Sequence, residues 1–153
     1  MDEIDRRILG ELRRDGRISW QQLGRLVHLS PNTVAERVRR LRRDGIIAGI
    51  GARPGWTALG RPLHALIDVK LVAGADRARF VEVLRAHPAV TAAHHATGRT
   101  DYVVAGHFTD LAELDDLLTG LKDEGIVADT ETRLVLHTLD LTRDADVGTG
   151  SRA

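Results

Sequence analysis

The 153-residue chain contains no cysteine. This absence excludes a disulfide framework, a thiol nucleophile and any zinc site built on cysteine. No apolar run approaches the ~18 residues that a membrane-spanning helix needs. Residues 1–5 are acidic and lack the basic start and apolar core of a secretory signal. We therefore expect a cytoplasmic protein with no membrane partner.

A net charge is also absent, because Lys plus Arg and Asp plus Glu each number 22. The charges are unevenly placed, however: residues 1–53 carry +5 and residues 54–153 carry −5. A basic segment joined to an acidic one favours a polyanion-binding module followed by a partner or ligand module. The alternative is that the uneven charge arises by chance in a short chain. The positions of the arginines on the predicted helices distinguish these two explanations.

Three helices are predicted in the first half of the chain. Helical spacing of apolar residues predicts the first over residues 2–15. Ser19 and Gln22 have the spacing of a capping box and predict the start of the second. Ser30 and Pro31 supply the N-cap and first residue of the third.

A short strand is predicted over residues 46–50, after the third helix. Together with the tight turn between the second and third helices, this order predicts a winged helix-turn-helix. The apolar residues expected to face its core are Ile4, Ile8, Leu9, Leu12, Leu23, Leu26, Val27, Val34, Val38 and Leu41.

The third helix carries the nucleic-acid hypothesis. With its apolar stripe inward, polar and basic residues cover its outer face, and five arginines lie between residues 37 and 43. The first residues of such a helix contact base edges in a major groove, and arginines further along contact phosphates. The start of the second helix also suits a phosphate. The expected DNA-binding residues are Ser19, Trp20, Ser30, Asn32, Thr33, Glu36, Arg37, Arg39, Arg40 and Arg43.

Two alternatives stay open for this helix. Its charged side can be the solvated face of a purely structural helix. Arg37 lies nearer the flank of the helix, where its stem can pack on the domain instead of reaching DNA.

The second half of the chain changes its period to the alternation of strands. The expected order is strand, helix, strand, strand, helix, strand, over residues 63–71, 76–87, 90–97, 102–108, 110–124 and 129–139. This is the ferredoxin-like βαββαβ arrangement, so the fold class is α+β.

Four segments follow from these patterns. The expected bounds are a DNA-binding domain over 1–51, a Gly/Pro-rich linker over 52–62, a ferredoxin-like domain over 63–141 and a disordered tail over 142–153.

The chain resembles the Lrp/AsnC family of feast/famine regulators from about residue 2 to residue 139. The residues that carry the resemblance are Asp5-Arg6-Arg7-Ile8-Leu9, Leu12, Asp15-Gly16-Arg17-Ile18-Ser19, Leu29-Ser30-Pro31, Glu36-Arg37-Val38-Arg39-Arg40-Leu41, Gly45-Ile46-Ile47 and, in the second half, Gly98 with Asp101-Tyr102. The resemblance implies a transcriptional regulator whose second domains form dimers, often assembled into octamers or other multiples. It also implies a small effector, usually an amino acid, bound between those domains.

Dimerisation also follows from the expected sheet. A four-stranded sheet with both helices on one face leaves the other face open, where Leu66 and Val72 invite a partner. A two-fold dimer places two recognition helices about one DNA turn (~34 Å) apart, or a multiple of it, which predicts a pseudo-palindromic operator.

The resemblance places the effector at the turn that carries the glycine and the aspartate. Backbone amides beside Gly98 suit a carboxylate, and Asp101 suits an ammonium group. The expected effector-binding residues are Gly98, Arg99, Thr100, Asp101, Tyr102, Thr130 and Thr132. Alternatively, Gly98 only makes a hairpin turn that Asp101 caps. Arg99 and Thr100 depart from the family pattern and add positive charge near the pocket.

No catalytic set, cofactor motif or metal-ligand spacing stands out. His94 and His95 are adjacent on an expected strand and therefore point to opposite faces. We expect no enzyme activity, no metal and no cofactor beyond the effector. The alternatives are a sirohaem-type tetrapyrrole decarboxylase, which shares the two-domain architecture, and a ligand-sensing module without DNA binding, against which residues 1–53 count.

Overall fold

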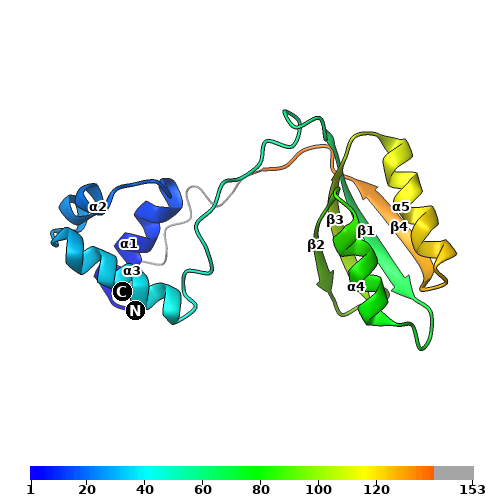
Figure 1. The fold of residues 1–153 in the computed structure, drawn as a ribbon, viewed down its shortest axis with the longest axis horizontal. Coiled ribbons are helices and arrows are strands. Elements are labelled where there is room, and N and C mark those ends of the chain that lie inside the picture. Colours follow the sequence, from blue (N-terminus) through cyan, green and yellow to red (C-terminus); the bar gives the residue numbers. More distant parts are fainter. Residues whose placement is uncertain (140–153) are drawn as a thin grey trace, which may run out of the picture. The chain divides into compact units, whose positions relative to one another are not determined.

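The structure is a computed structural model that describes residues 1–139. The chain divides into two compact units, residues 1–53 and residues 54–138, which are described separately (Figure 1). The tail predicted over 142–153 lies outside the described residues. Within the described part, no helix is long and apolar enough to cross a membrane.

Three capped helices form the first unit: α1 (Glu3–Arg14), α2 (Trp20–Val27) and α3 (Pro31–Arg43). The predicted capping box of α2 is present, because the Gln22 amide donates to Ser19 Oγ and the Ser19 amide to Gln22 Oε1. Ser30 caps α3 by accepting from the Thr33 amide at 3.2 Å, with Pro31 as the first helical residue. Helical order is thus specified by local signals.

The core of this unit consists of apolar residues from all three helices and the segment after α3. Leu26, expected in that core, is 46% exposed, so this expectation is wrong. α2 buries Leu23, Gly24 and Val27 instead, and Leu26 is turned about 100° from Val27 around the helix. The buried residues are Ile8, Leu12, Leu23, Val27, Val34, Val38, Leu41 and Ile47.

The turn between α2 and α3 depends on a glycine. His28 adopts the left-handed conformation (φ 56°), and the Leu29 amide donates to the Gly24 carbonyl at 2.9 Å. This return brings the chain so close to α2 that a Cβ on Gly24 would lie 2.5 Å from the Leu29 carbonyl oxygen. Gly24 therefore allows the tight helix-turn-helix angle.

The strand predicted over residues 46–50 is not formed, so that expectation is wrong. The amides of Ile46 and Ile47 both donate to the Leu41 carbonyl and close the end of α3. Ile47 turns its side chain into the helical core. The apolar pattern of this segment reflects packing against the helices, and the helix-turn-helix stands without a wing strand in the described part.

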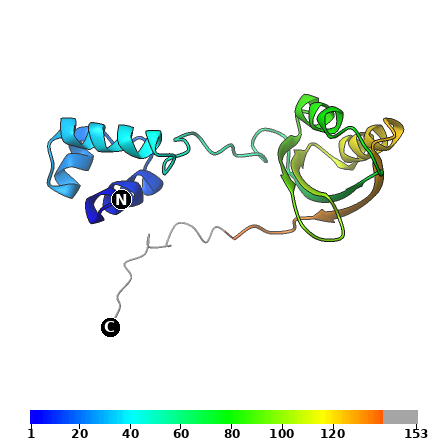
Figure 2. The same cartoon turned by 90° about the horizontal axis from the view of Figure 1, so that it is seen from below.

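The second unit is an antiparallel four-stranded sheet with the strand order β2-β3-β1-β4. Its elements are β1 (Leu63–Leu71), α4 (Arg77–Ala86), β2 (Val90–His95), β3 (Tyr102–Phe108), α5 (Leu111–Asp123) and β4 (Val127–Leu134). The predicted βαββαβ order is confirmed, and both helices cover one face of the sheet (Figure 2). β2 and β4 end before residues 97 and 139, their predicted limits.

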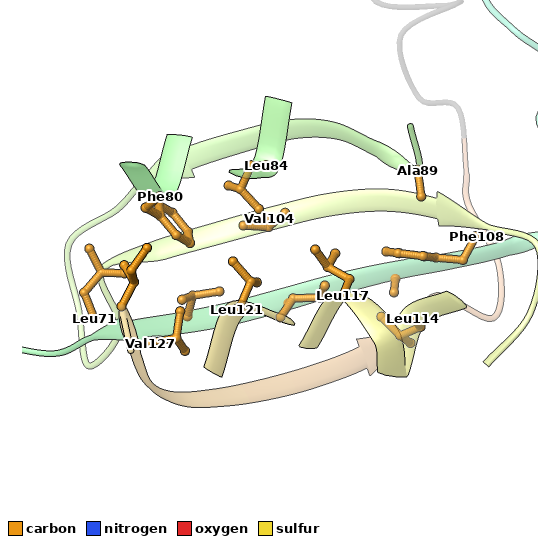
Figure 3. Close-up of a cluster of buried hydrophobic side chains, with 14 residues drawn as sticks. Leu71, Phe80, Leu84, Ala89, Val104, Phe108, Leu114, Leu117, Leu121 and Val127 are labelled. Atoms are coloured by element: carbon orange, nitrogen blue, oxygen red, sulfur yellow. The ribbon is translucent and has the colours of Figure 1, made fainter. Parts of the chain in front are cut away.

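Side chains from both helices and the sheet form the core of this unit (Figure 3). Phe80 and Leu84 of α4, and Leu117 and Leu121 of α5, are buried against the sheet. Alternate residues of β1 point to them: Ala65, Ile67, Val69 and Leu71. Alternation along β1 thus decides which sheet face the helices cover.

The segment before β1 is anchored to this sheet. Trp56 stacks on His107 with ring centroids 4.7 Å apart, and His107 stacks on His64 at 4.3 Å. Burial, and secondarily the nearby His64, lower the pKa of His107. The sequence pattern of a Gly/Pro-rich linker over 52–62 gives no sign of this anchoring, because it depends on contacts distant in sequence.

Arg61 makes a second anchor for the same segment. Its Nη1 donates to the His107 carbonyl at 3.1 Å and forms an ion pair with Glu113 at 2.8 Å. The Thr109 amide donates to the same carboxylate. This hydrogen bond and the Arg61 ion pair outweigh the opposing effect of burial and lower the pKa of Glu113 to about 2. The residues from Trp56 to Arg61 are thus fixed at both ends to the sheet unit.

Replacing Gly24 by alanine is expected to destabilise the first unit by about 2 kcal/mol, because the added Cβ overpacks the turn. Gly10→Ala is the matched control. A Cβ at Gly10 meets nothing within 4 Å, and alanine stabilises a helix interior by about 0.5–1 kcal/mol. Urea unfolding followed by Trp20 fluorescence in a Trp56→Phe background measures the first unit alone. Equal effects of the two alanines would contradict the close approach at Gly24.

Candidate DNA-binding surface and effector turn

The outer face of α3 is arranged as its sequence pattern predicts. Val34, Val38 and Leu41 are buried, and the opposite side exposes Asn32, Glu36, Arg39 and Arg43. Arg43 is 74% exposed and makes only a long contact of 3.7 Å with Asp44. An amide and a carboxylate at the start of the helix, followed by guanidinium groups, can meet base edges and then phosphates.

The hydroxyl groups expected at this surface serve first as caps. Ser19 Oγ and Ser30 Oγ each accept an amide three residues later. The Thr33 hydroxyl lies 2.8 Å from Ser30 Oγ, so it belongs to the same cap. Trp20 is 39% exposed in the first turn of α2. These residues order the helix starts, while Asn32 and Glu36 present polar groups on the outer face.

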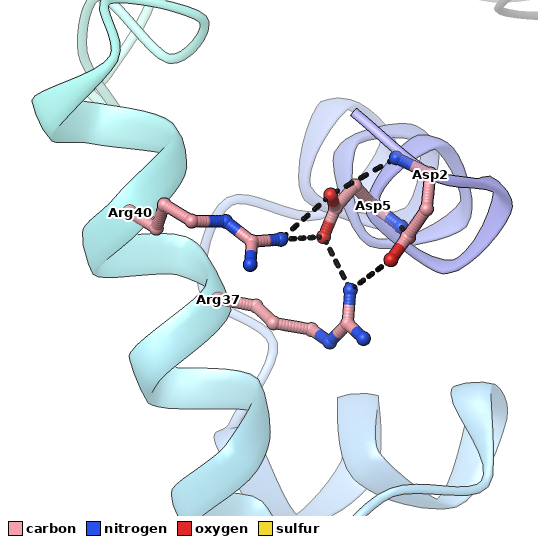
Figure 4. Close-up of polar contacts among 4 residues, drawn as sticks. All are labelled: Asp2, Asp5, Arg37 and Arg40. Carbon is pink, nitrogen blue, oxygen red and sulfur yellow. Dashed lines mark hydrogen bonds and ion pairs between the residues drawn. The ribbon is translucent and has the colours of Figure 1, made fainter.

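Arg37 and Arg40 turn away from that face toward α1 (Figure 4). Arg37 Nη1 contacts Asp5 at 2.8 Å and Asp2 at 2.6 Å. Arg40 Nη2 contacts both oxygens of Asp5, at 3.1 and 2.8 Å. The sequence predicts both arginines as DNA contacts. In the structure both contact the start of α1 instead, consistent with the flank position noted for Arg37.

Asp5 is the centre of this cluster. It is only 1% exposed and is the one buried charged or polar residue among residues 1–139. Burial opposes ionisation, but hydrogen bonds from Arg37 and the Asp2 amide outweigh it and hold the pKa of Asp5 below its ordinary value. A buried carboxylate is stable only when its charge is paired and hydrogen-bonded.

Sequence reasoning missed the role of Asp2 and Asp5. Asp2 Oδ1 accepts from the Asp5 amide, and Asp5 Oδ2 accepts from the Asp2 amide, which makes a capping box at the start of α1. The three-residue spacing of two acidic residues before an apolar run was the available signal. No sequence signal names the arginines, more than 30 residues away, that complete the site.

Asp101 has a structural position at the turn expected to hold the effector. Its amide donates to the Val69 carbonyl at 2.8 Å, and its Oδ2 accepts from the Leu71 amide at 2.9 Å. Gly98 has φ +137°, which favours glycine. The turn is therefore joined to the end of β1, and one carboxylate oxygen of Asp101 is already engaged.

The other expected effector residues fall into two groups. The strand register pairs Tyr102 and Thr130 with Val69, and Thr132 with Ile67, so these three share the helix-covered face. Arg99 instead forms an exposed ion pair of 3.4 Å with Glu131, whose register partner is Asp68. The expected set therefore surrounds one end of β1 but does not lie on a single face.

A shallow hollow of about 520 Å³ lies at the opposite end of β1, and its lining is mostly apolar. Its residues are Pro62, Leu63, Thr109, Asp110, Leu111 and Ala112. It does not include the turn at Gly98. In residues 1–139, no group of three or more His, Asp or Glu is placed to hold a metal ion.

Removing Arg37 is expected to destabilise the first unit by about 3 kcal/mol, because Asp5 stays buried while losing a charge partner. Arg6→Ala is the control, since the Arg6–Glu3 pair is exposed and worth about 0.5 kcal/mol or less. The same Trp20-monitored urea unfolding measures both. A cost for Arg37→Ala no larger than that of Arg6→Ala would show that the cluster does not hold α3 to α1.

Comparisons with known proteins agree with this arrangement. Residues 1–42 match the AsnC-type helix-turn-helix domain, and residues 64–144 match the Lrp/AsnC ligand-binding domain. The leucine-responsive regulatory protein of Haemophilus influenzae is 35% identical, over 93% of this chain and 87% of that protein. Its Escherichia coli K12 counterpart is 36% identical, over 90% and 85%.

Solved structures show the same fold. LrpC of Bacillus subtilis is 28% identical, with a TM-score of 0.84 over 92% of this chain and 98% of that one. A transcriptional regulator from Neisseria meningitidis in complex with L-methionine is 29% identical, with a TM-score of 0.82 over 92% of both chains. The named relatives are transcriptional regulators, so the tetrapyrrole decarboxylase alternative is not favoured.

Known regulators therefore match both parts of this chain, the helix-turn-helix and the ligand-binding domain that follows it, over most of its length. The chain belongs to the Lrp/AsnC family and is a DNA-binding transcriptional regulator with a ligand-binding domain.

Proposed function

We propose that the regulator reads an operator sequence with α3 in the major groove. The observation that carries this proposal is the division of α3 into a buried apolar stripe and an exposed face of Asn32, Glu36, Arg39 and Arg43. Asn32 and Glu36 meet base edges, and the two arginines meet phosphates. Ser19, Ser30 and Thr33 order the helix starts, and Trp20 lies beside the phosphate backbone.

We propose that two chains pair through the open face of the sheet. The register places Leu66, Ala105 and Val103 on the face opposite the helices. Charged residues border them on the same face: Asp68 and Arg133 form an ion pair of 2.6 Å. An apolar strip beside residues of both charges suits a two-fold partner. Such a dimer, or a multiple such as an octamer, would bind a pseudo-palindromic operator in the cytoplasm.

The effector proposed for the ligand-binding domain is an amino acid. Its support is the domain match and the relative bound to L-methionine. The turn from Gly98 to Tyr102, with Thr130 and Thr132 across the end of β1, is the proposed site. The ligand changes DNA binding only if it has different affinities for two assembly states.

The groove assignment is tested by two substitutions with different expected results. Asn32→Ala should relax base preference by about 1–3 kcal/mol at one position. Arg39→Gln should weaken binding to all sequences and reduce the slope of log K against log salt by about 0.9 per chain. Binding to a duplex selected by the wild type from a random pool, and to random DNA, measures both. If both variants bind as the wild type does, α3 does not enter the groove.

The effector site is tested by thermal shift with the twenty amino acids and by one substitution. A ligand at about 100 times its Kd stabilises by about 2.7 kcal/mol. Asp101→Asn keeps an oxygen for the Leu71 amide but removes the charge for an ammonium group, so the shift should disappear while stability is retained. The control is Asp110→Asn, another acid that caps an amide. An unchanged shift in Asp101→Asn would remove Asp101 from the site.

A further inference from the structure

Asp5 divides the arginines of the recognition helix into two groups. Arg37 and Arg40 contact its buried carboxylate, and Asp2 adds a second negative charge to the cluster. The positive charges of Arg37 and Arg40 are therefore balanced by the negative charges of these two aspartates. Arg39, Arg42 and Arg43 are exposed on the same helix. Of the five arginines in α3, three therefore offer their charge outward.

The contact with Asp5 has its largest consequence at Arg40, because this residue lies close to the face of α3 proposed to meet DNA. It lies one turn after Glu36, beside the outer face of α3. Its side chain is 44% exposed, whereas that of Arg37 is 22% exposed. Without Asp5, the flexible stem of Arg40 would let its guanidinium group reach toward DNA. With Asp5, its Nη2 is held at 2.8 Å from a carboxylate oxygen.

We propose that Asp5 withholds Arg40 from the DNA phosphates and thereby limits the sequence-independent part of the regulator's affinity for DNA. Phosphate contacts supply affinity without sequence information, and they supply nearly all of non-specific binding. Holding one cation of the recognition helix against a buried carboxylate lowers affinity for every sequence but leaves the base contacts of Asn32 and Glu36 intact. Operator affinity and non-specific affinity therefore fall by a similar factor, and both depend less steeply on salt.

The same contacts position the helix. Arg37 joins Asp2 and Asp5 of α1 to the middle of α3. The direction of α3 relative to α1 is then set before DNA arrives, which reduces the ordering cost of binding. This inference rests on the proposed function, because it requires that the outer face of α3 meets DNA.

The first experiment compares Arg40→Gln with Arg39→Gln in the full-length protein. Binding to double-stranded DNA of random sequence is measured over a range of salt concentrations. Arg39→Gln should reduce the salt slope by about 0.9 per chain, and Arg40→Gln should leave it unchanged. If Arg40→Gln reduces the slope as Arg39→Gln does, Arg40 contacts phosphate and the inference is overturned. If neither changes it, the groove assignment and this inference fall together.

The second experiment releases Arg40. Asp5→Asn should steepen the salt slope by about 0.9 per chain on random DNA and on the selected duplex alike. The double variant Asp5→Asn/Arg40→Gln should return the slope to the wild-type value. A merely structural role of Asp5 would weaken binding to both DNAs without steepening the slope, and that result would overturn the inference. Circular dichroism checks that Asp5→Asn folds. If it does not fold, the comparison of Arg40→Gln with Arg39→Gln tests the inference by itself.

Discussion

The buried carboxylate of Asp5 is the interaction on which the DNA-binding unit depends. It caps the start of α1 together with Asp2, and it accepts hydrogen bonds from two arginines of α3. One acidic group therefore orders the first helix, joins it to the recognition helix and sets which arginines of that helix are turned outward. Its burial makes the requirement strict, because an unpaired charge in that position is costly.

In the ligand-binding unit, contacts between residues distant in sequence likewise fix the chain near the two ends of β1. At one end, Asp101 joins the turn after β2 to the last residues of the strand. At the other end, Trp56 and Arg61 hold the preceding segment against His107 and Glu113. Asp101 ties its turn to β1 itself, whereas Trp56 and Arg61 tie their segment to β3 and α5. The same sheet thus carries both the turn proposed for the ligand and the face proposed for a second chain.

Local patterns predicted most of this architecture. The Ser19–Gln22 box, the Ser30–Pro31 start and the alternation along β1 act through neighbours no more than four residues apart, so they can be read directly. These patterns gave wrong predictions where the same apolar residues are compatible with two different structures. Leu26 has helical spacing but faces outward, and residues 46–50 have strand character but use the amides of Ile46 and Ile47 to close α3.

The sequence alone determined the helix starts, the order of helices and strands along the chain and the basic character of α3, because these depend on periodicity and on caps within one turn. Only the tertiary structure decided that Arg37 and Arg40 pair with Asp5, that Thr130 and Thr132 lie on the helix-covered face, and that Asp101 holds the end of β1. Each of these depends on register or on partners at least 30 residues apart. Such partners are selected by packing and by the cost of burying a charge, which no local pattern records.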